Sequence, residues 1–407
     1  MEAAVRTLRQ DAKVIGLISV AHGLSHFYQL VIAVLFPLIK TDLGVSYAAL
    51  GATTALFYVV SGLCQTAAGF LVDRYGARRV LIAGLALCSA GVLLAGFAQH
   101  YAMLVAAAAV AGVGNSVFHP ADFAILNARV EQKRLGYAFS FHGFAGTMGW
   151  ALAPAFSYGV SALYGWHTAL RLSAALGLTM LVLLVASGQA LAIERPQAAA
   201  RAAARPLAAD VRVLLQGPVL MCFFFFLLLA AALIGVQSFG VAALIAYYGT
   251  PVALASAALT AYLVGQALGI LFGGYVAGRT ARHDAVAATG MAGSALCMLG
   301  VALGALAPAS LAPLLALSGF LTGTTNPSRD LLVRAATPKD AVGKVYGFVY
   351  SGLDVGSMSV PILYGWLLDH GRPQGVFYGV FGLLLLTVLT VLQLPERTAR
   401  AQEQGVR

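Results

Sequence analysis

Long apolar runs alternate with short polar segments along the whole of this chain. About 20 apolar residues in a helix cross the hydrocarbon core of a bilayer, where helices are favoured because they satisfy their backbone hydrogen bonds internally. The pattern therefore predicts an all-α integral membrane protein with twelve transmembrane helices. The predicted spans are residues 14–39, 46–72, 79–98, 101–128, 135–163, 168–193, 216–246, 252–277, 286–306, 309–334, 341–368 and 375–394.

Composition agrees with a membrane protein, because 60% of the 407 residues are hydrophobic and only 10% are charged. The formal net charge is +10, and cytoplasmic loops of membrane proteins carry an excess of Lys and Arg. Of the 25 Lys and Arg residues, the outer side receives only Lys40, Arg171 and Arg372, and Arg329 lies inside a span. The basic charge thus predicts a multi-pass inner-membrane protein with both termini in the cytoplasm, and no nucleic-acid partner.

One hydrophilic stretch, ERPQAAARAAARPLAADVRVLL, follows the sixth span and divides the chain. Its alanines and arginines suit a short helix on the inner membrane surface, and a plain linker is the alternative. The predicted organisation is an N-terminal six-helix bundle (1–193), a cytoplasmic linker (194–215), a C-terminal six-helix bundle (216–394) and a cytoplasmic tail (395–407).

The two halves repeat. A shift of 205 residues (274 − 69) aligns GFLVDRYGAR, which begins at Gly69, with GYVAGRTAR, which begins at Gly274. A shift of 207 residues (327 − 120) aligns Pro120 with Pro327. Helix breakers at matched places indicate a duplicated, pseudo-symmetric transporter.

The fourth predicted span, which includes GVGNSVFHPADFAILNAR, has a polar stripe. Its spacing puts four polar residues on one helical face, namely Asn115, His119, Asp122 and Arg129. Pro120 has no N–H for the carbonyl of Ser116, so it should kink this helix. Charged groups at membrane depth are costly unless they face water or other protein. We expect a water-lined transport pathway, with a structural contact between packed helices as the alternative.

Histidines from three spans are expected at one depth. At 1.5 Å per residue, His22, His119 and His142 lie roughly 10–14 Å from the cytoplasmic surface, and His26 lies one turn deeper. Histidine suits proton coupling because its pKa is near neutrality. His119 and Asp122 are close enough on one helix to share a proton. The imidazoles could also bind a metal ion, although no Cys or Met accompanies them.

Under the shift of 207 residues, Asp122 aligns with Arg329. We expect these charges to pair at an inner gate in one transport state, and the alternative is that each pairs within its own half. Trp150 is expected to anchor the membrane interface and Gln29 to make a packing contact. The predicted substrate- or proton-binding residues are His22, His26, Asn115, His119, Asp122, His142, Asn326, Arg329 and Asp354. We predict no catalytic residue, no metal site and no cofactor.

The loop between the second and third spans, GFLVDRYGARR, resembles the signature of the major facilitator superfamily, and the likeness covers the whole chain. The resemblance implies a transporter, not an enzyme, in which two six-helix halves alternate access to a central site. In that superfamily the loop latches the halves together when the outer gate is open. The residues implied in this gating loop are Gly69, Asp73, Arg74, Gly76 and Arg78, with Arg129 as a basic partner.

Within the superfamily, the run Asn115-Ser-Val-Phe-His-Pro120 resembles the fosmidomycin-resistance exporters, which export drugs in exchange for protons. Drug antiporters have a Gly-rich fifth span with a Gly-Pro pair, whereas this fifth span has Gly143, Gly146, Gly149 and Pro154 but no such pair. We expect proton-coupled export of a small polar or anionic compound or drug. Proton-coupled uptake of a metabolite, metal-ion import and a non-transporting sensor stay open. The expected partners are the substrate, protons and the lipid bilayer, and the protein is expected to be monomeric.

Overall fold

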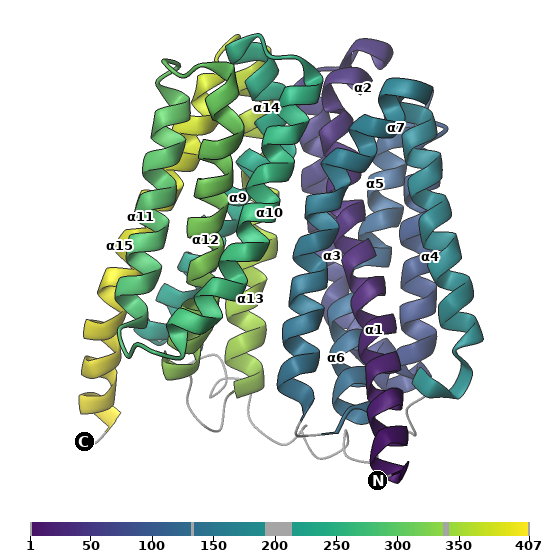
Figure 1. Cartoon of the computed structure of the whole chain (residues 1–407), viewed down its shortest axis with the longest axis vertical. Coiled ribbons are helices and arrows are strands. Elements are labelled where there is room, and N and C mark those ends of the chain that lie inside the picture. The colour runs from purple at the N-terminus through teal and green to yellow at the C-terminus, as the bar shows by residue number, and fades with distance from the viewer. Residues whose placement is uncertain (1, 132–133, 192–213, 337–341, 406–407) are drawn as a thin grey trace. The chain divides into compact units, whose positions relative to one another are not determined.

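The computed structural model describes residues 2–131, 134–191, 214–336 and 342–405 (Figure 1). Within these ranges the chain forms helices joined by short turns, and it forms no strand. It divides into two compact units, of which unit 1 is Met1–Val45 with Leu56–Ala200 and unit 2 is Ser46–Ala55 with Arg201–Arg407. The predicted linker lies almost entirely outside the described residues.

Unit 1 begins with one long helix and ends with another that holds two predicted spans. Its elements are α1 (Glu2–Val31), η1 (Ala33–Leu35), α2 (Phe36–Leu43), most of α3 (Tyr47–Tyr75), α4 (Ala77–Ala95), α5 (Tyr101–Asn115), α6 (Phe118–Arg129), α7 (Leu135–Ala186) and η3 (Gly188–Leu191). The backbone of α7 leaves helical geometry at Gly165, with a φ of 80° and a ψ of 162°. Residues with a side chain rarely adopt this conformation, so glycine marks the turn between the fifth and sixth predicted spans.

Unit 2 contains the remaining helices and also the first turns of α3. Its other elements are α9 (Gly217–Tyr248), α10 (Val252–Ala277), α11 (His283–Ala302), α12 (Pro308–Ala336), α13 (Val342–Ser359), α14 (Pro361–Asp369) and α15 (Gln374–Gly405). The backbone N–H groups of Tyr47 and Ala48 donate to the carboxylate of Asp369 at 2.9 and 2.8 Å. A carboxylate satisfies N–H groups that lack an intrahelical partner at the start of a helix, so α14 holds the beginning of α3.

Nine helical segments of the described residues are long and apolar enough to cross a membrane. One of them, Tyr137–Ala186, contains two predicted spans. The predicted spans 309–334 and 341–368 correspond to α12 and to α13 with α14. Each predicted span thus matches a helical segment, which confirms the twelve-helix fold in two six-helix bundles. The predicted tail starts within α15, which continues as a helix to Gly405.

The fourth predicted span consists of α5 and α6, separated by a turn at Ser116 and Val117. Pro120 provides no N–H for the carbonyl of Ser116, so the helical ladder is interrupted here. The predicted kink is confirmed. It leaves Asn115 at the end of α5 and places His119 in the first turn of α6.

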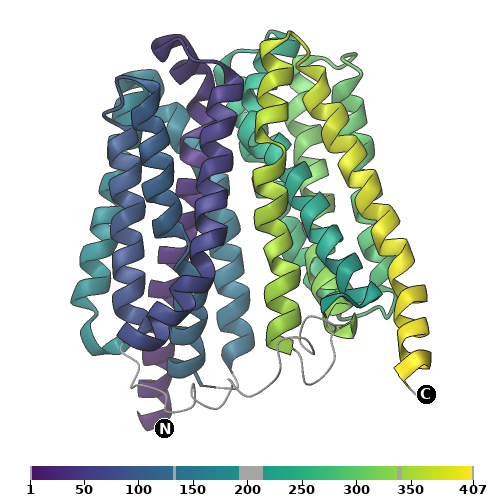
Figure 2. The ribbon, with the colours of Figure 1, turned by 180° about the vertical axis from the view of Figure 1, so that it is seen from behind.

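The same pairs of helices pack in both units. In unit 1, α1 packs against α7, and α4 packs against α5 and α7. In unit 2 the corresponding pairs are α9 with α13, α11 with α12, and α11 with α15. Figure 2 shows α15, in yellow, as one continuous helix of unit 2. The repeated pairs agree with the internal duplication seen in the sequence.

Glycines allow α1 and α7 to approach closely. A Cβ added at Gly146 would lie 2.9 Å from Nδ1 of His26 and 3.1 Å from Cδ2 of His22. A Cβ added at Gly149 would collide with the backbone carbonyl of Gly23. Small residues at a helix crossing let two backbones come together within a membrane. The Gly-rich face of the fifth span is therefore the surface against which α1 and its two histidines pack.

We expect Gly149→Ala to destabilise the protein, because the backbone of Gly23 cannot move aside as a side chain could. Overpacking of this kind costs about 1–3 kcal/mol. The measurement is the apparent melting temperature of the detergent-solubilised protein. Gly159→Ala on the same helix is a matched control, since a Cβ there meets nothing within 4 Å and alanine favours the helix. Equal melting temperatures for the two variants would contradict this packing.

Candidate functional site

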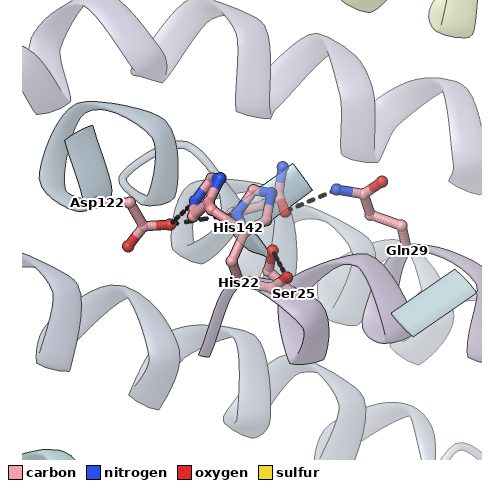
Figure 3. Close-up of polar contacts among 6 residues, drawn as sticks. His22, Ser25, Gln29, Asp122 and His142 are labelled. Carbon is pink, nitrogen blue, oxygen red and sulfur yellow. Dashed lines mark hydrogen bonds and ion pairs between the residues drawn. The ribbon is translucent and has the colours of Figure 1, made fainter. Parts of the chain in front are cut away.

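A buried carboxylate between two imidazoles forms the centre of the candidate site in unit 1 (Figure 3). Oδ2 of Asp122, on α6, lies 3.1 Å from Nε2 of His142, on α7, in a hydrogen bond. The same oxygen lies 3.2 Å from Nδ1 of His22, on α1. All three residues are buried, and the Asp122 side chain has no exposed surface. Three helices thus meet at one carboxyl group that is shielded from water.

The hydrogen bond between Asp122 and His142 can hold a proton in two ways. An ionised carboxylate only accepts, so Nε2 of His142 then carries the hydrogen. A protonated carboxyl group can instead donate to an unprotonated Nε2. Among the described residues, Oδ1 of Asp122 is buried and has no hydrogen-bond partner. A buried polar atom of this kind is uncommon and leaves an acceptor available inside the site.

The other two predicted histidines border this centre. The His22 ring stacks on His142 with centroids 3.6 Å apart, and it lies 4.4 Å from His26 and 5.3 Å from His119. The structure therefore brings all four predicted imidazoles together. His119 is exposed, whereas His22 and His142 are buried.

His119 and Asp122 both lie on α6, and no hydrogen bond between their side chains is described. The proton sharing expected of this pair stays a prediction for Asp122. The described contacts of its carboxylate are to His142 and His22. His119 instead stacks on Phe123 with ring centroids 6.0 Å apart. The turn at Ser116 and Val117 precedes both His119 and Asp122, so the spacing of a regular helix still relates these two residues. The described hydrogen bond of Asp122 is nevertheless formed between helices, with His142 on α7.

One ring stack followed by three hydrogen bonds connects His26 to α3. The His26 ring stacks on Trp150 at 4.3 Å, and Nε1 of Trp150 donates to Oε1 of Gln29 at 3.1 Å. Nε2 of Gln29 donates to Oδ1 of Asn115 at 3.2 Å, and Nδ2 of Asn115 donates to Oγ of Ser61 at 2.9 Å. Asn115, predicted as a site residue, is therefore connected to the imidazoles through Gln29 and Trp150.

The expectations for two of these residues were wrong. Trp150 does not anchor the interface but joins the internal network, and Gln29 makes hydrogen bonds at both ends of its amide. Trp150 lies two turns after His142 on the same helix, which puts both on one face. That spacing could have identified Trp150 as a neighbour of the histidines. Ser61 has no comparable signal in the sequence.

Unit 2 has a guanidinium, that of Arg329, at the position that aligns with Asp122. Nε of Arg329 donates to Oδ1 of Asp330 at 3.0 Å, and Nη1 donates to Oδ1 of Asn326 at 3.4 Å. The guanidinium carbon lies 4.6 Å from the ring centroid of Phe226. The Tyr350 hydroxyl donates to the same oxygen of Asp330 at 3.2 Å. Arg329 is thus held by a carboxylate, an amide and an aromatic ring.

Each of the two aligned charges therefore has a partner within its own unit. Asp122 contacts His142 and His22 in unit 1, and Arg329 contacts Asp330 in unit 2. The expected pairing of Asp122 with Arg329 in another state stays a prediction. Asp354, on α13, is half-buried and makes no hydrogen bond or ion pair with the described residues.

The predicted gating loop connects α3 to α4. Gly76 has a φ of 88°, a conformation that requires glycine at this turn. The Arg78 guanidinium donates to the carbonyls of Leu184 at 3.4 Å and Val185 at 2.8 Å. Nε of Arg129 donates to the carbonyl of Ala190 at 2.9 Å. Gly69 and Arg74 lie on the last turns of α3, and the side chain of Asp73 lies outside what the structure describes.

The central residues also offer atoms that a metal ion could use. One ligand atom each of His22, Asp122 and His142 lies within 4.8 Å of the others. A tetrahedral site needs a fourth ligand, and this group of described residues has three. The close contact of Asp122 with His142 also has the geometry of a hydrogen bond.

A family model described as Major Facilitator Superfamily matches residues 18–245 and 227–407. The chain belongs to the major facilitator superfamily. It is therefore a multi-pass membrane protein of a transporter family and not an enzyme.

Curated relatives match only part of the chain. The fosmidomycin resistance protein of Escherichia coli (strain K12) is 29% identical over 164 residues, or 40% of each chain. The probable L-galactonate transporter of the same organism is 26% identical over 129 residues, which are 32% of this chain and 28% of that protein. A multidrug resistance protein B homolog of Mycobacterium tuberculosis (strain ATCC 25618 / H37Rv) is 26% identical over 168 residues, 41% of this chain and 31% of that protein. The chain thus matches two fifths or less of the length of these relatives.

Solved structures match almost the whole chain. The nucleoside transporter NupG aligns with a TM-score of 0.76 and 16% identity, covering 94% of this chain and 99% of the other. A bacterial homolog of the human lysosomal transporter Spinster aligns with a TM-score of 0.70 and 15% identity, covering 96% and 97%. These likenesses show the fold.

We expect Asp122→Asn and His142→Gln to be energetically coupled, because the two side chains share a buried hydrogen bond. Residues in contact typically show coupling energies of about 0.5–3 kcal/mol in double-mutant cycles. Reversible unfolding in mixed detergent micelles measures the four free energies of the cycle. The matched cycle of Asp122→Asn with His119→Gln should couple less strongly. Stronger coupling to His119 than to His142 would contradict this site.

Proposed function

We propose that this protein is a proton-coupled secondary active transporter that exports a small polar or anionic compound or drug by alternating access. The observation that carries the proposal is the Asp122 carboxylate, which is buried between His22 and His142 at the centre of unit 1. An isolated buried charge is costly in a membrane, so such groups are retained where they serve transport.

The proton would enter through the exposed histidine. His119 is exposed and its ring lies 5.3 Å from that of His22, which in turn contacts Asp122. Protonating the Asp122–imidazole group changes its net charge by one. Such a change alters which conformations of the surrounding helices are favoured, and this is how a bound ligand shifts a conformational equilibrium.

The substrate would be an anion bound at Arg329 of unit 2. A guanidinium has five N–H donors, and the contacts of Arg329 with Asp330 and Asn326 use only part of them. Its planar fork suits carboxylate and phosphate groups. Asn326, about one turn before Arg329 on α12, would add an amide to this site. Asp354, on α13, would repel an anion when ionised, so it would serve as a proton-binding group instead.

Export is favoured over uptake by the relatives named for drug resistance. The fosmidomycin resistance protein and the multidrug resistance protein B homolog both match this chain. The probable L-galactonate transporter matches at similar identity, so proton-coupled uptake is the alternative. Import of a metal ion is a further alternative, because three possible ligand atoms meet at Asp122. The remaining alternative is a membrane sensor that transports nothing.

We expect Asp122→Asn to remove proton-driven transport, because an amide keeps the shape of the carboxyl group but cannot ionise. Purified protein in proteoliposomes is given an imposed pH gradient and a panel of labelled probes, with fosmidomycin first, then small organic anions, matched cations and Zn²⁺. Wild-type protein should accumulate an anion against its gradient, driven by protons moving the opposite way. The Asp122→Asn variant should reach only equilibrium, while exchange of the same probe across the membrane survives.

Asp284→Asn, in the first turn of α11, is the matched control and should transport as the wild type does. Accumulation driven by protons moving the same way as the probe would reverse the proposed direction. Zn²⁺ as the sole accumulated probe would identify metal import, and no transport of any probe would favour the sensor. Undiminished proton-driven accumulation by Asp122→Asn would remove Asp122 from the coupling.

A further inference from the structure

An apolar groove lies on unit 1 between α3, α4 and α5, and its lining residues include no histidine. It has a cavity volume of about 450 Å³, within the range of small-molecule sites. Its floor is made by small residues, including Ala68 and Gly84, and exposed Leu71 and Leu87 stand at its sides. A groove with this lining binds a hydrocarbon chain through apolar contact and offers few groups to a polar solute.

One end of the groove is basic. Tyr75, at the end of α3, and Arg79, near the start of α4, both line it, and Arg79 is exposed. Arg74 is also exposed, and its guanidinium carbon lies 5.4 Å from the ring centroid of Tyr75. The guanidinium of Arg78 is already held by backbone carbonyls of α7. The two exposed cations thus stand where the apolar groove ends.

We propose that this groove binds an anionic phospholipid, with an acyl chain along α3 and α4 and the phosphate against Arg79 and Arg74. The occupant follows from charge and polarity, because the groove joins an apolar channel to a cationic end. Phospholipids have this same order of groups, and basic pockets between transmembrane helices bind anionic head groups. The segment from 73 to 79 carries Arg74, Arg78 and Arg79 against Asp73, so its sequence is net positive.

The position of the groove gives the lipid a role. Its basic end is the α3–α4 turn, which is the predicted gating loop. A lipid phosphate at Arg79 and Arg74 would hold this turn, and the proportion of anionic lipid in the membrane would then affect the transporter through it. This inference does not depend on the substrate or on proton coupling.

A cysteine in the groove reports whether the groove is filled. Cys64 lines it and is half-buried, whereas Cys88, Cys222 and Cys297 are buried. The protein is placed in nanodiscs of phosphatidylcholine alone, or of phosphatidylcholine with phosphatidylglycerol. Alkylation of Cys64 by a small, uncharged, apolar maleimide is followed by mass spectrometry. We expect phosphatidylglycerol to slow alkylation several-fold, and Arg79→Gln to remove that difference.

Two controls separate a bound lipid from a general effect of membrane charge. Arg279→Gln removes one charge from the equivalent turn of unit 2 and should keep the protection of Cys64. Leu178→Cys in a Cys64→Ala background places a thiol at an exposed position of α7 outside the groove, and phosphatidylglycerol should not protect it.

Three results would overturn the proposal. They are equal alkylation of Cys64 in both membranes, protection that persists in Arg79→Gln, and equal protection at position 178. Protection that follows the protein density in the membrane, at fixed lipid composition, would identify a second copy of the chain as the occupant and would overturn it as well. Each variant is first shown to elute as a single species, so that loss of protection is not loss of fold.

Discussion

The structure of unit 1 depends on how one buried carboxylate is stabilised. Asp122 has no exposed surface and lies among apolar helices, where an isolated charge would be very costly. His142 and His22 contact its oxygen, and both come from helices other than its own. The two histidines reach Asp122 because Gly146 and Gly149 on α7 leave room for α1. A second reason is that α6 begins as a separate helix after the turn at Ser116 and Val117. The close packing of these three helices is thus what brings the two imidazoles to the carboxyl group.

The internal repeat places a charge of opposite sign at the equivalent position of unit 2. Arg329 is supported by Phe226 on α9, Asp330 on α12 and, through Asp330, Tyr350 on α13. In unit 1 the corresponding helices are α1, α6 and α7. The same scaffold therefore holds a carboxyl group in one half and a guanidinium in the other, each with partners of its own.

The fold could be predicted from the sequence because it depends on features that can be counted along the chain. These features are the lengths of the apolar runs, the basic residues in the loops and the prolines at matched positions of the two halves. The depth of the histidines also follows from residue counting, and four imidazoles do meet. Their partners could not be predicted, because a contact between helices depends on rotation and kinking. Asp122 illustrates this, since its hydrogen-bond partner is His142 on another helix, although His119 lies three residues away on its own helix. The hydrogen bonds of Trp150 and Gln29 could not be predicted for the same reason. A side chain that bridges two helices cannot be told from a packing or interface residue when each span is considered by itself.

The central claim is that the Asp122–imidazole group binds and releases the transported proton. Infrared difference spectroscopy of the protein in lipid tests it most directly, because a protonated carboxyl group has a C=O band that a carboxylate lacks. Spectra are compared between about pH 5 and pH 8, where imidazole-linked groups change charge. The account predicts a carboxyl band that changes with pH, is absent in Asp122→Asn and shifts in frequency in His142→Gln, where its hydrogen-bond partner is replaced. A pH-dependent band that is the same in all three proteins, or no such band in the wild type, would contradict it.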